Sequence, residues 1–263
     1  MRKLSTFLSV NQILALTTAI ATCAIVTHLQ WNKMAEQKDG QRLSKSEYLK
    51  EEQDAATNIE LLSKLPSLGF DNLIADAAFL SFVQYFGDDN ARNVTGYSVT
   101  PKFFEVAVER DPLFLEMYPI LSSTITLFSG NPTKSIELLD KGIQNIPEKL
   151  KSKAYFLHQA KATDELLFMG KPQAAEQSYR AAAEWVSKSP TEENQAIAQR
   201  SLQTAQFLSK NPDSRNAQIN AWLNILGSSI DERTQTLAIR QIEQLGGTIE
   251  FMDGRINITF PDE

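Results

Sequence analysis

The chain has few of the residues that most catalytic and metal sites require. Its 263 residues include two histidines, His28 and His158, and one cysteine, Cys23. Nucleophilic catalysis by serine or cysteine needs a histidine base in most cases, and a zinc site needs about four suitable ligands. The sequence also lacks the G-x-x-x-x-G-K-[ST] and G-x-G-x-x-G phosphate-binding motifs. We therefore predict a protein that is not an enzyme, with no catalytic residue, no metal site and no cofactor.

Glycine, proline and positive charge are also scarce. The counts of 11 Gly and 10 Pro argue against a loop-rich β fold, whereas 42% apolar residues suffice for a sizeable core. The formal charge is −6 at pH 7, and residues 1–31 carry Arg2 and Lys3 without an acid, so the rest of the chain carries −8. This balance argues against nucleic acid as a partner. The single cysteine excludes an intramolecular disulfide.

The N-terminal segment has the composition of a membrane anchor. Residues 13–29, ILALTTAIATCAIVTHL, contain no acidic or basic side chain except His28, and Trp31 and Lys33 follow where interfacial anchors are common. We predict an N-terminal membrane anchor at residues 1–31, and hence a single-pass membrane protein.

Two questions about this anchor stay open. A cleaved signal peptide is an alternative, because Arg2 and Lys3 form a basic n-region and residues 19–21, Ala-Ile-Ala, offer a small-x-small cleavage site. The side of the membrane on which the following domain lies is also open. The basic residues after the span outnumber those before it, which gives a slight lean toward the cytoplasm.

Small side chains recur along one face of the predicted span. They occupy every fourth position, at Ala15, Ala19, Cys23 and Thr27. Membrane helices associate through such faces, so these residues are our candidate contact with a partner's helix in the membrane. The alternative is that Ala and Thr are simply common in a weakly apolar span.

The next two segments predict a polar helix followed by a buried one. Residues 32–67 are rich in Lys, Glu, Gln and Ser and predict a helical connector. Residues 70–86, FDNLIADAAFLSFVQYF, carry apolar side chains on nearly every face, which predicts a deeply buried helix. Its one central acid, Asp76, would then either sit at the edge of the buried face or need a salt bridge, for which we expect Arg92 or Arg110 as the partner.

A helix-turn-helix motif occurs twice, 40 residues apart. Its two copies are Gly130-x-Pro132-x-x-Ser135-x-x-x-Leu139-x-x-Gly142 and Gly170-x-Pro172-x-x-Ala175-x-x-x-Tyr179-x-x-Ala182. In each copy the glycine can end one helix in a left-handed conformation, and the proline can begin the next. The small residues at 135/175 and 142/182 would let two helices cross closely.

This pattern resembles a degenerate tetratricopeptide repeat over residues 100–190, with Pro147 as the proline that follows the second helix. The period is 40 residues instead of 34, and Ser122 stands where the family has glycine. The segments LGFDNLIADAAFLSFVQYFGD at 68–88 and ERDPLFLEMY at 109–118 are also similar to membrane-anchored repeat proteins of uncharacterised role in bacteria, including cyanobacteria. The resemblance implies stacked helix pairs and transfers no activity.

The last segment changes from helical to strand periodicity. Helices are predicted over 191–208, 217–226 and 231–245, and alternating residues around Asp253-Gly254 predict a β-hairpin. The predicted fold is thus all-α. It comprises a transmembrane helix within residues 1–31, a connector at 32–67, a tetratricopeptide-like α-solenoid at 68–245 and a small hairpin at 246–263.

Stacked helix pairs leave a concave face that suits protein partners. The candidate protein-binding residues on it are Tyr118, Tyr155, Lys151, His158 and Lys161, although the two tyrosines could instead pack between helices. We predict a membrane-tethered scaffold or assembly factor for a membrane protein complex. A permanent accessory subunit of such a complex is the alternative, and a carboxylate-dependent hydrolase is a remote one.

Overall fold

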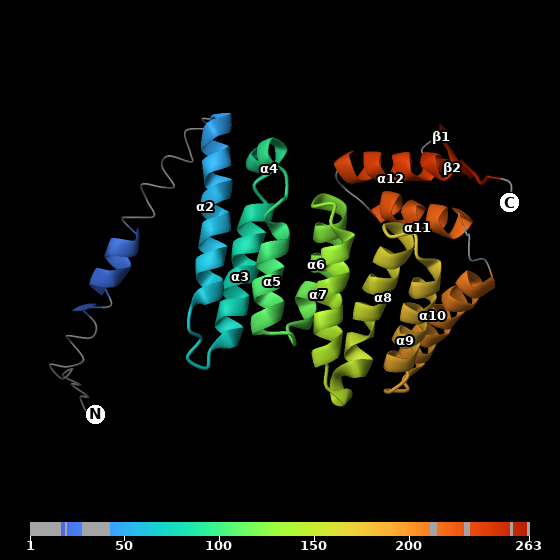
Figure 1. The fold of residues 1–263 in the computed structure, drawn as a ribbon, viewed down its shortest axis with the longest axis horizontal. Coiled ribbons are helices and arrows are strands. Elements are labelled where there is room, and N and C mark those ends of the chain that lie inside the picture. The colour runs from blue at the N-terminus through green and yellow to red at the C-terminus, as the bar shows by residue number, and fades with distance from the viewer. Residues whose placement is uncertain are drawn as a thin grey trace, which may run out of the picture. The chain divides into compact units, whose positions relative to one another are not determined.

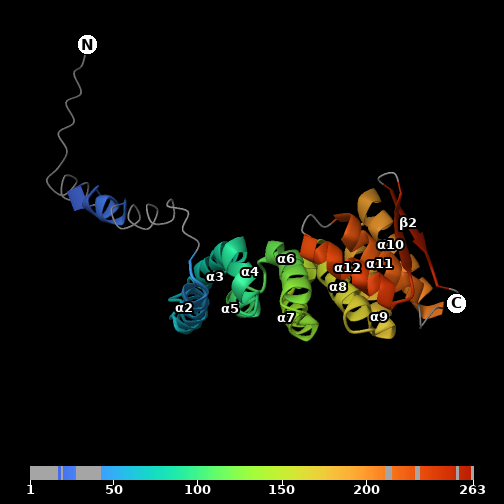
Figure 2. The same ribbon diagram turned by 90° about the horizontal axis from the view of Figure 1, so that it is seen from above.

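The computed structural model describes residues 17, 18, 20–27, 43–210, 215–228, 232–252 and 255–261. Its contacts divide the chain into two compact units, Met1–Glu47 and Tyr48–Glu263. The second unit is a stack of helices in chain order, with the last two helices running across the direction of the earlier ones (Figures 1 and 2). Most of the helices pack on helices that are close in the sequence, as in an α-solenoid.

The helices of this series are short and separated by tight turns. They are α2 (Lys45–Lys64), α3 (Asp71–Phe86), α4 (Asp89–Thr95), α5 (Thr100–Arg110), α6 (Tyr118–Ser123), α7 (Pro132–Asn145), α8 (Lys151–Leu167), α9 (Pro172–Val186), α10 (Glu192–Lys210), α11 (Arg215–Ser228) and α12 (Glu232–Gln244). The 3₁₀ turns η1 (Leu115–Met117) and η3 (Glu148–Leu150) precede α6 and α8, and the π-helical turn η2 (Thr124–Phe128) extends α6.

The two predicted glycine-proline turns have the conformation that the sequence indicates. Gly130 and Gly170 adopt φ angles of +66° and +59°, a region that favours glycine. Pro132 and Pro172 then lie in the first turn of α7 and α9, where a missing N–H costs no helical hydrogen bond. These turns fold α7 back on the helix before it and α9 back on α8.

Small residues lie where these helices cross, as predicted. Ser135, Ala175 and Ala182 are fully buried, and Gly142 of α7 faces Tyr118 of α6. A Cβ atom built on Gly142 would lie only 2.5 Å from Cζ of Tyr118. The absence of a side chain at position 142 is therefore what allows the tyrosine ring to fit between the two helices.

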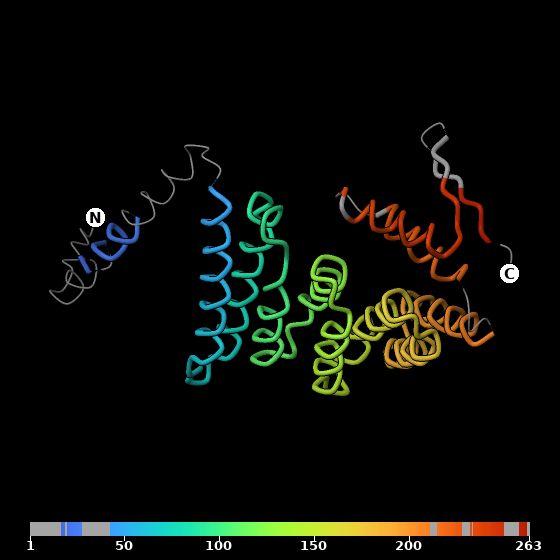
Figure 3. The backbone as a smooth tube through the Cα atoms, turned by 45° about the horizontal axis from the view of Figure 1, so that its top comes forward, coloured from blue at the N-terminus to red at the C-terminus, as the bar shows by residue number. Residues whose placement is uncertain are grey.

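Two large apolar clusters, and a small one of Ala183, Val186, Ile197 and Ala198 between α9 and α10, hold the series together. The first joins α2, α3, α5, α6, α7 and α8 through rings such as Phe82, Phe103 and Phe104. The second joins α8 and α9 to α10, α11 and α12, with Trp222 and Ile242 fully buried. After α12 the chain enters strands β1 (Thr248–Met252) and β2 (Arg255–Thr259), which pair antiparallel with Ile249 opposite Ile258 (Figure 3). The predicted C-terminal hairpin is present.

The prediction of a single-pass membrane span, and of the membrane location that follows from it, is wrong for the residues that the structure describes. None of the described helices is both long and apolar enough to cross a bilayer. The helical residues described in this segment are 17, 18 and 20–27. Of the predicted helix contact, Cys23 and Thr27 are exposed, and Ala15 and Ala19 lie outside the described residues.

Candidate protein-binding groove

Helix α3 is buried on one side only, so the prediction of a deeply buried helix is wrong for its outer face. Its inner face packs Ile74, Ala78 and Phe82 against the core. Its outer face presents Leu73 and Leu80 to solvent, with 57% and 62% of their surface exposed. These two residues are seven positions apart and thus lie two turns from one another on the same side of the helix. Val83 continues this exposed side and Phe70 begins it.

Helix α2 and the loop after it add more exposed apolar side chains beside this face. Leu61 near the end of α2 is 58% exposed, Leu65 just after the helix is 50% exposed, and Leu68 in the loop is exposed as well. A leucine alone on a surface is ordinary, whereas a concentration of them over residues 61–83 is not. Exposed apolar surface of this kind marks contact with another molecule.

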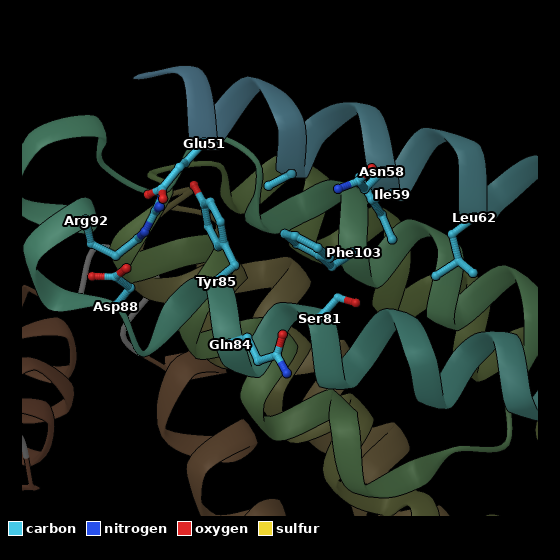
Figure 4. Close-up of a pocket in the computed structure, with 11 residues that line it drawn as sticks. Glu51, Asn58, Ile59, Leu62, Ser81, Gln84, Tyr85, Asp88, Arg92 and Phe103 are labelled. Carbon is cyan, nitrogen blue, oxygen red and sulfur yellow. The ribbon is translucent and has the colours of Figure 1, made fainter. Parts of the chain in front are cut away.

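A groove separates α2 from α3 above the side chain of Phe103 of α5 (Figure 4). Ile59 and Leu62 of α2 line one wall, and Ser81 and Gln84 of α3 line the other. Its volume is about 380 Å³. Helical spacing places Leu80 one turn before Gln84, at the rim of the groove. We call the space between the two helices, together with this rim, the α2/α3 groove.

A polar cluster holds the first half of α2 at one end of this groove. The carboxylate of Glu52 accepts hydrogen bonds from the hydroxyls of Tyr85, at 3.1 Å, and Ser98, at 3.0 Å. The guanidinium of Arg92 lies 3.6 Å from the centre of the Tyr85 ring and 3.8 Å from Glu52 Oε1. Burial raises the pKa of Tyr85 to about 12, so its hydroxyl remains a donor at any physiological pH.

A second polar attachment holds the end of α2. Arg110 of α5 donates hydrogen bonds to the backbone carbonyls of Ser63, at 2.5 Å, and Leu65, at 2.9 Å, and it pairs with Asp71 at 3.1 Å. The salt bridge predicted for Asp76 is therefore wrong in both forms, because Arg110 binds Asp71 and Arg92 lies beside Glu52. Asp76 lies instead on the exposed face of α3, between Leu73 and Leu80.

The charge along the groove is predominantly negative. Glu51 and Asp88 line it, and Asp54 and Asp76 are exposed on the two helices that form its walls. Arg92 is the basic side chain among the described lining residues. It is only 5% exposed and already donates to Thr95 Oγ1 and the carbonyl of Gly96. A ligand entering from solvent therefore meets carboxylates.

Comparisons with known proteins were made for the whole chain. No protein-family model, curated protein or solved structure matches it. Its function is therefore argued from its own residues.

Tyr118 and Tyr155 were predicted to contact a protein partner, and for Tyr118 this prediction is wrong. Tyr118 is fully buried between α6 and α7, and its hydroxyl donates to the carbonyl of Pro112 at 2.9 Å. It cannot touch a partner, because Gly142 covers its ring. Tyr155 is half-buried and packs edge-on against Phe156. The alternative that these tyrosines pack between helices therefore holds for Tyr118.

The three other predicted contacts are engaged with neighbouring helices. Lys151 Nζ lies 5.5 Å from the centre of the Trp185 ring of α9, besides its local pair with Glu148, and Lys161 pairs with Asp140 of α7 at 2.5 Å. The ring of His158 stands edge-on against Trp185 of α9, with 4.4 Å between the ring centres. Burial lowers the pKa of His158 to about 4, so the imidazole is neutral at pH 7. These contacts stabilise the packing of α8 on α7 and α9.

Two adjacent carboxylates of α8, Asp164 and Glu165, form a buried polar network that the sequence did not reveal. Asp164 accepts hydrogen bonds from Ser135 of α7, at 2.6 Å, and Ser122 of α6, at 3.1 Å. Glu165 accepts one from Ser178 of α9 at 2.7 Å. Each is less than a tenth exposed, so no substrate reaches them from solvent. Within the described residues, no three His, Cys, Asp or Glu side chains are grouped to hold a metal ion.

The α2/α3 groove was missed because the sequence pattern was judged by hydrophobicity alone. Hydrophobic side chains around a helix indicate burial, but they do not show which sides the same chain covers. The sequence does carry a signal for this surface. One inward-facing side of α3 is already filled by the inner-face residues, so Leu73, Leu80 and Val83 are apolar residues beyond those that this side needs.

Proposed function

We propose that this protein is a non-enzymatic helical-repeat module that binds other proteins through the α2/α3 groove. The observation that carries the proposal is α3 itself. Its sequence is apolar beyond the inner face, and Leu73, Leu80 and Val83 are 57%, 62% and 48% exposed to water. Covering a fully exposed leucine is worth about 1.5–3 kcal/mol, so an uncovered row of them favours association.

The helix pairs α6–α7 and α8–α9 support a finer proposal, that the module is related in architecture to tetratricopeptide repeats. Each pair has a left-handed glycine between its helices, a proline that opens the second helix, and small buried residues at the crossing. Modules of this construction present surfaces along a stack of helices and serve as scaffolds. A scaffold or assembly factor is the role we propose, with a permanent subunit as the alternative.

The test of this proposal is the variant Leu80→Lys, which should lose protein partners and keep its stability. Leu80 is 62% exposed, so a lysine there is solvated and should change the melting temperature by less than about 2 °C. Partners bound to the wild-type full chain should be identified by affinity purification and quantified for the variant. We expect their recovery to fall at least about tenfold, since a charge would have to be buried against an apolar contact.

The matched control is Leu202→Lys on α10, another exposed leucine changed in the same way. It should retain every partner. Equal recovery with both variants would contradict the role of the groove. Recovery of no specific partner with the wild type would contradict the proposal as a whole. A stoichiometric partner that survives high salt would indicate a permanent subunit, and substoichiometric partners would indicate a scaffold or assembly factor.

A further inference from the structure

We infer that a second site, separate from the α2/α3 groove, binds an organic cation whose nitrogen carries methyl groups. The site is a cavity of about 1020 Å³, which we call the aromatic cavity. Its walls come from the end of α3, from α4 and the loop after it, from η2 and from α12. The inference does not depend on the proposed function, because none of these lining residues belongs to the α2/α3 groove.

Three aromatic rings form one wall of the aromatic cavity. Phe86 of α3, Tyr97 of the loop after α4 and Phe128 of η2 lie in a triangle, with 5.0 Å between the ring centres of each pair. All three rings line the cavity, and each residue is only partly buried. The cluster therefore presents aromatic surface to the space beside it. The face of an aromatic ring carries partial negative charge and attracts cations.

Hydrogen bonds hold the backbone of this wall in place. Ser129, which follows η2, donates from its hydroxyl to the carbonyl of Tyr97 at 2.7 Å. The preceding carbonyl, that of Gly96, accepts a hydrogen bond from Arg92 Nη1 at 2.9 Å. The turn η2 that carries Phe128 is π-helical, a rare conformation that is frequent at functional sites. A wall that is formed in advance binds a ligand without the entropic cost of ordering it.

Two carboxylates give one end of the aromatic cavity a negative charge. Asp89 lies three residues after Phe86, and Glu232 begins α12; both are exposed and line the cavity. Arg240 is the basic side chain among the described lining residues, and eight residues, or ~12 Å of helix, separate it from Glu232. The first turn of α12 is the part of that helix nearest α4 (Figures 1 and 2). Glu232 therefore lies toward Asp89, and Arg240 lies away from it.

The combination of rings and carboxylates selects the class of ligand. An anion is repelled by Asp89 and Glu232. A bare ammonium group is compact and strongly hydrated, whereas methyl groups give a larger cation that contacts ring faces and apolar side chains. Leu127 and Leu237 line the same cavity and suit such methyl groups. The same head group occurs in small molecules such as choline and in the methylated lysines of proteins, so the two sources share one recognition chemistry.

The experiment compares choline with its neutral carbon analogue, in which a tert-butyl group replaces the trimethylammonium group. Dissociation constants should be measured by ligand-observed NMR titration of the full chain. The neutral analogue should bind at least about tenfold more weakly, because it keeps the apolar contact and loses the attraction to rings and carboxylates.

Three variants locate the site. The double variant Asp89→Asn/Glu232→Gln should bind choline at least about tenfold more weakly and the neutral analogue equally well. Phe128→Leu keeps an apolar side chain without the ring and should weaken choline binding at least about threefold. The control Glu193→Gln removes an exposed acid of α10 and should change neither constant. Thermal unfolding shows whether each variant is folded, and the double variant changes exposed residues only.

Three results would overturn the inference. These are equal affinities of choline and its neutral analogue for the wild type, an unchanged affinity for choline in the double variant, and no saturable binding of choline by the wild type. A short peptide that contains trimethyl-lysine distinguishes the two sources. If it binds more tightly than choline, the ligand is a side chain of another protein; if choline binds more tightly, the ligand is a small molecule. Either order supports the site.

Discussion

Replacing Gly142 with leucine is expected to lower the free energy of unfolding by about 3 kcal/mol, the upper part of the range for overpacked cores. The new Cβ alone would lie 2.5 Å from Cζ of Tyr118, and the rest of the side chain would have to enter the same space. The tyrosine ring cannot swing away, because it is fully buried and its hydroxyl is bound to Pro112. In a domain of this size the melting temperature should fall by about 6–12 °C.

The control for this prediction is Gln144→Leu, which adds a leucine at an exposed position of the same helix. It should change the melting temperature little. The contact with Tyr118 is tested by a double-mutant cycle with Tyr118→Ala, which removes the ring. The double variant should be more stable than the sum of the two single effects by about 1 kcal/mol or more. Strict additivity would show that the leucine at position 142 is accommodated elsewhere.

Asp164 is expected to make the protein less stable as the pH rises from 4 to 7. Burial raises the pKa of Asp164 to about 6, although the Ser135 and Ser122 hydroxyls favour its charged form. The pKa in the unfolded chain is near 3.8. The folded state therefore holds the proton more tightly, and the stabilisation present below pH 4 is lost as the pH passes 6. The loss is about 2–3 kcal/mol.

The measurement is urea unfolding of the wild type and Asp164→Asn between pH 4 and 8. The asparagine variant keeps the shape without the ionisation, so the free energy of the wild type should fall relative to the variant by about 2–3 kcal/mol as the pH rises. His158, whose pKa burial lowers, titrates in both proteins, and its contribution cancels in the difference. Glu165 repels the Asp164 carboxylate, so the difference reports the ionisation of Asp164 together with this coupling. A difference that is constant with pH would contradict the prediction.

The conformational preferences of glycine and proline were enough to predict where the helices of the two repeats end and begin, and the small residues predicted where these helices cross. Gly130 and Gly170 have φ angles that few other residues adopt, and Pro132 and Pro172 can only begin a helix, so each acts within a few residues of sequence. The outward side of α3 escaped such rules, because hydrophobicity indicates that a side chain will be covered but not by which molecule. The span at residues 13–29 rested on marginal length, and composition alone did not decide it.

The hydrogen bonds that join distant helices could not be predicted from the sequence, for a different reason. Glu52 reaches Ser98 across 46 residues, and Asp164 reaches Ser122 across 42. Nothing in the local spacing of these residues indicates that they meet, because the meeting depends on how several helices stack. Arg110 binds the backbone carbonyl of Ser63, and every residue has such a carbonyl, so the identity of residue 63 gives no hint of this contact. Asp76, by contrast, was assigned a bridge from the assumption that its helix is buried on all sides.

The way in which α2 is attached has a consequence for the breadth of ligands that the groove accepts. Tyr48 and Ile59 are the buried residues of this helix, and it is otherwise fixed by Glu52 near one end and Arg110 near the other. Hydrogen bonds to long, flexible side chains tolerate small rotations of a helix, whereas an interdigitated apolar seam does not. Ala55, Ala56 and Leu62 add apolar contacts on the core side only. Under the proposed function, a spacing between α2 and α3 that adjusts in this way would let one module hold several related clients.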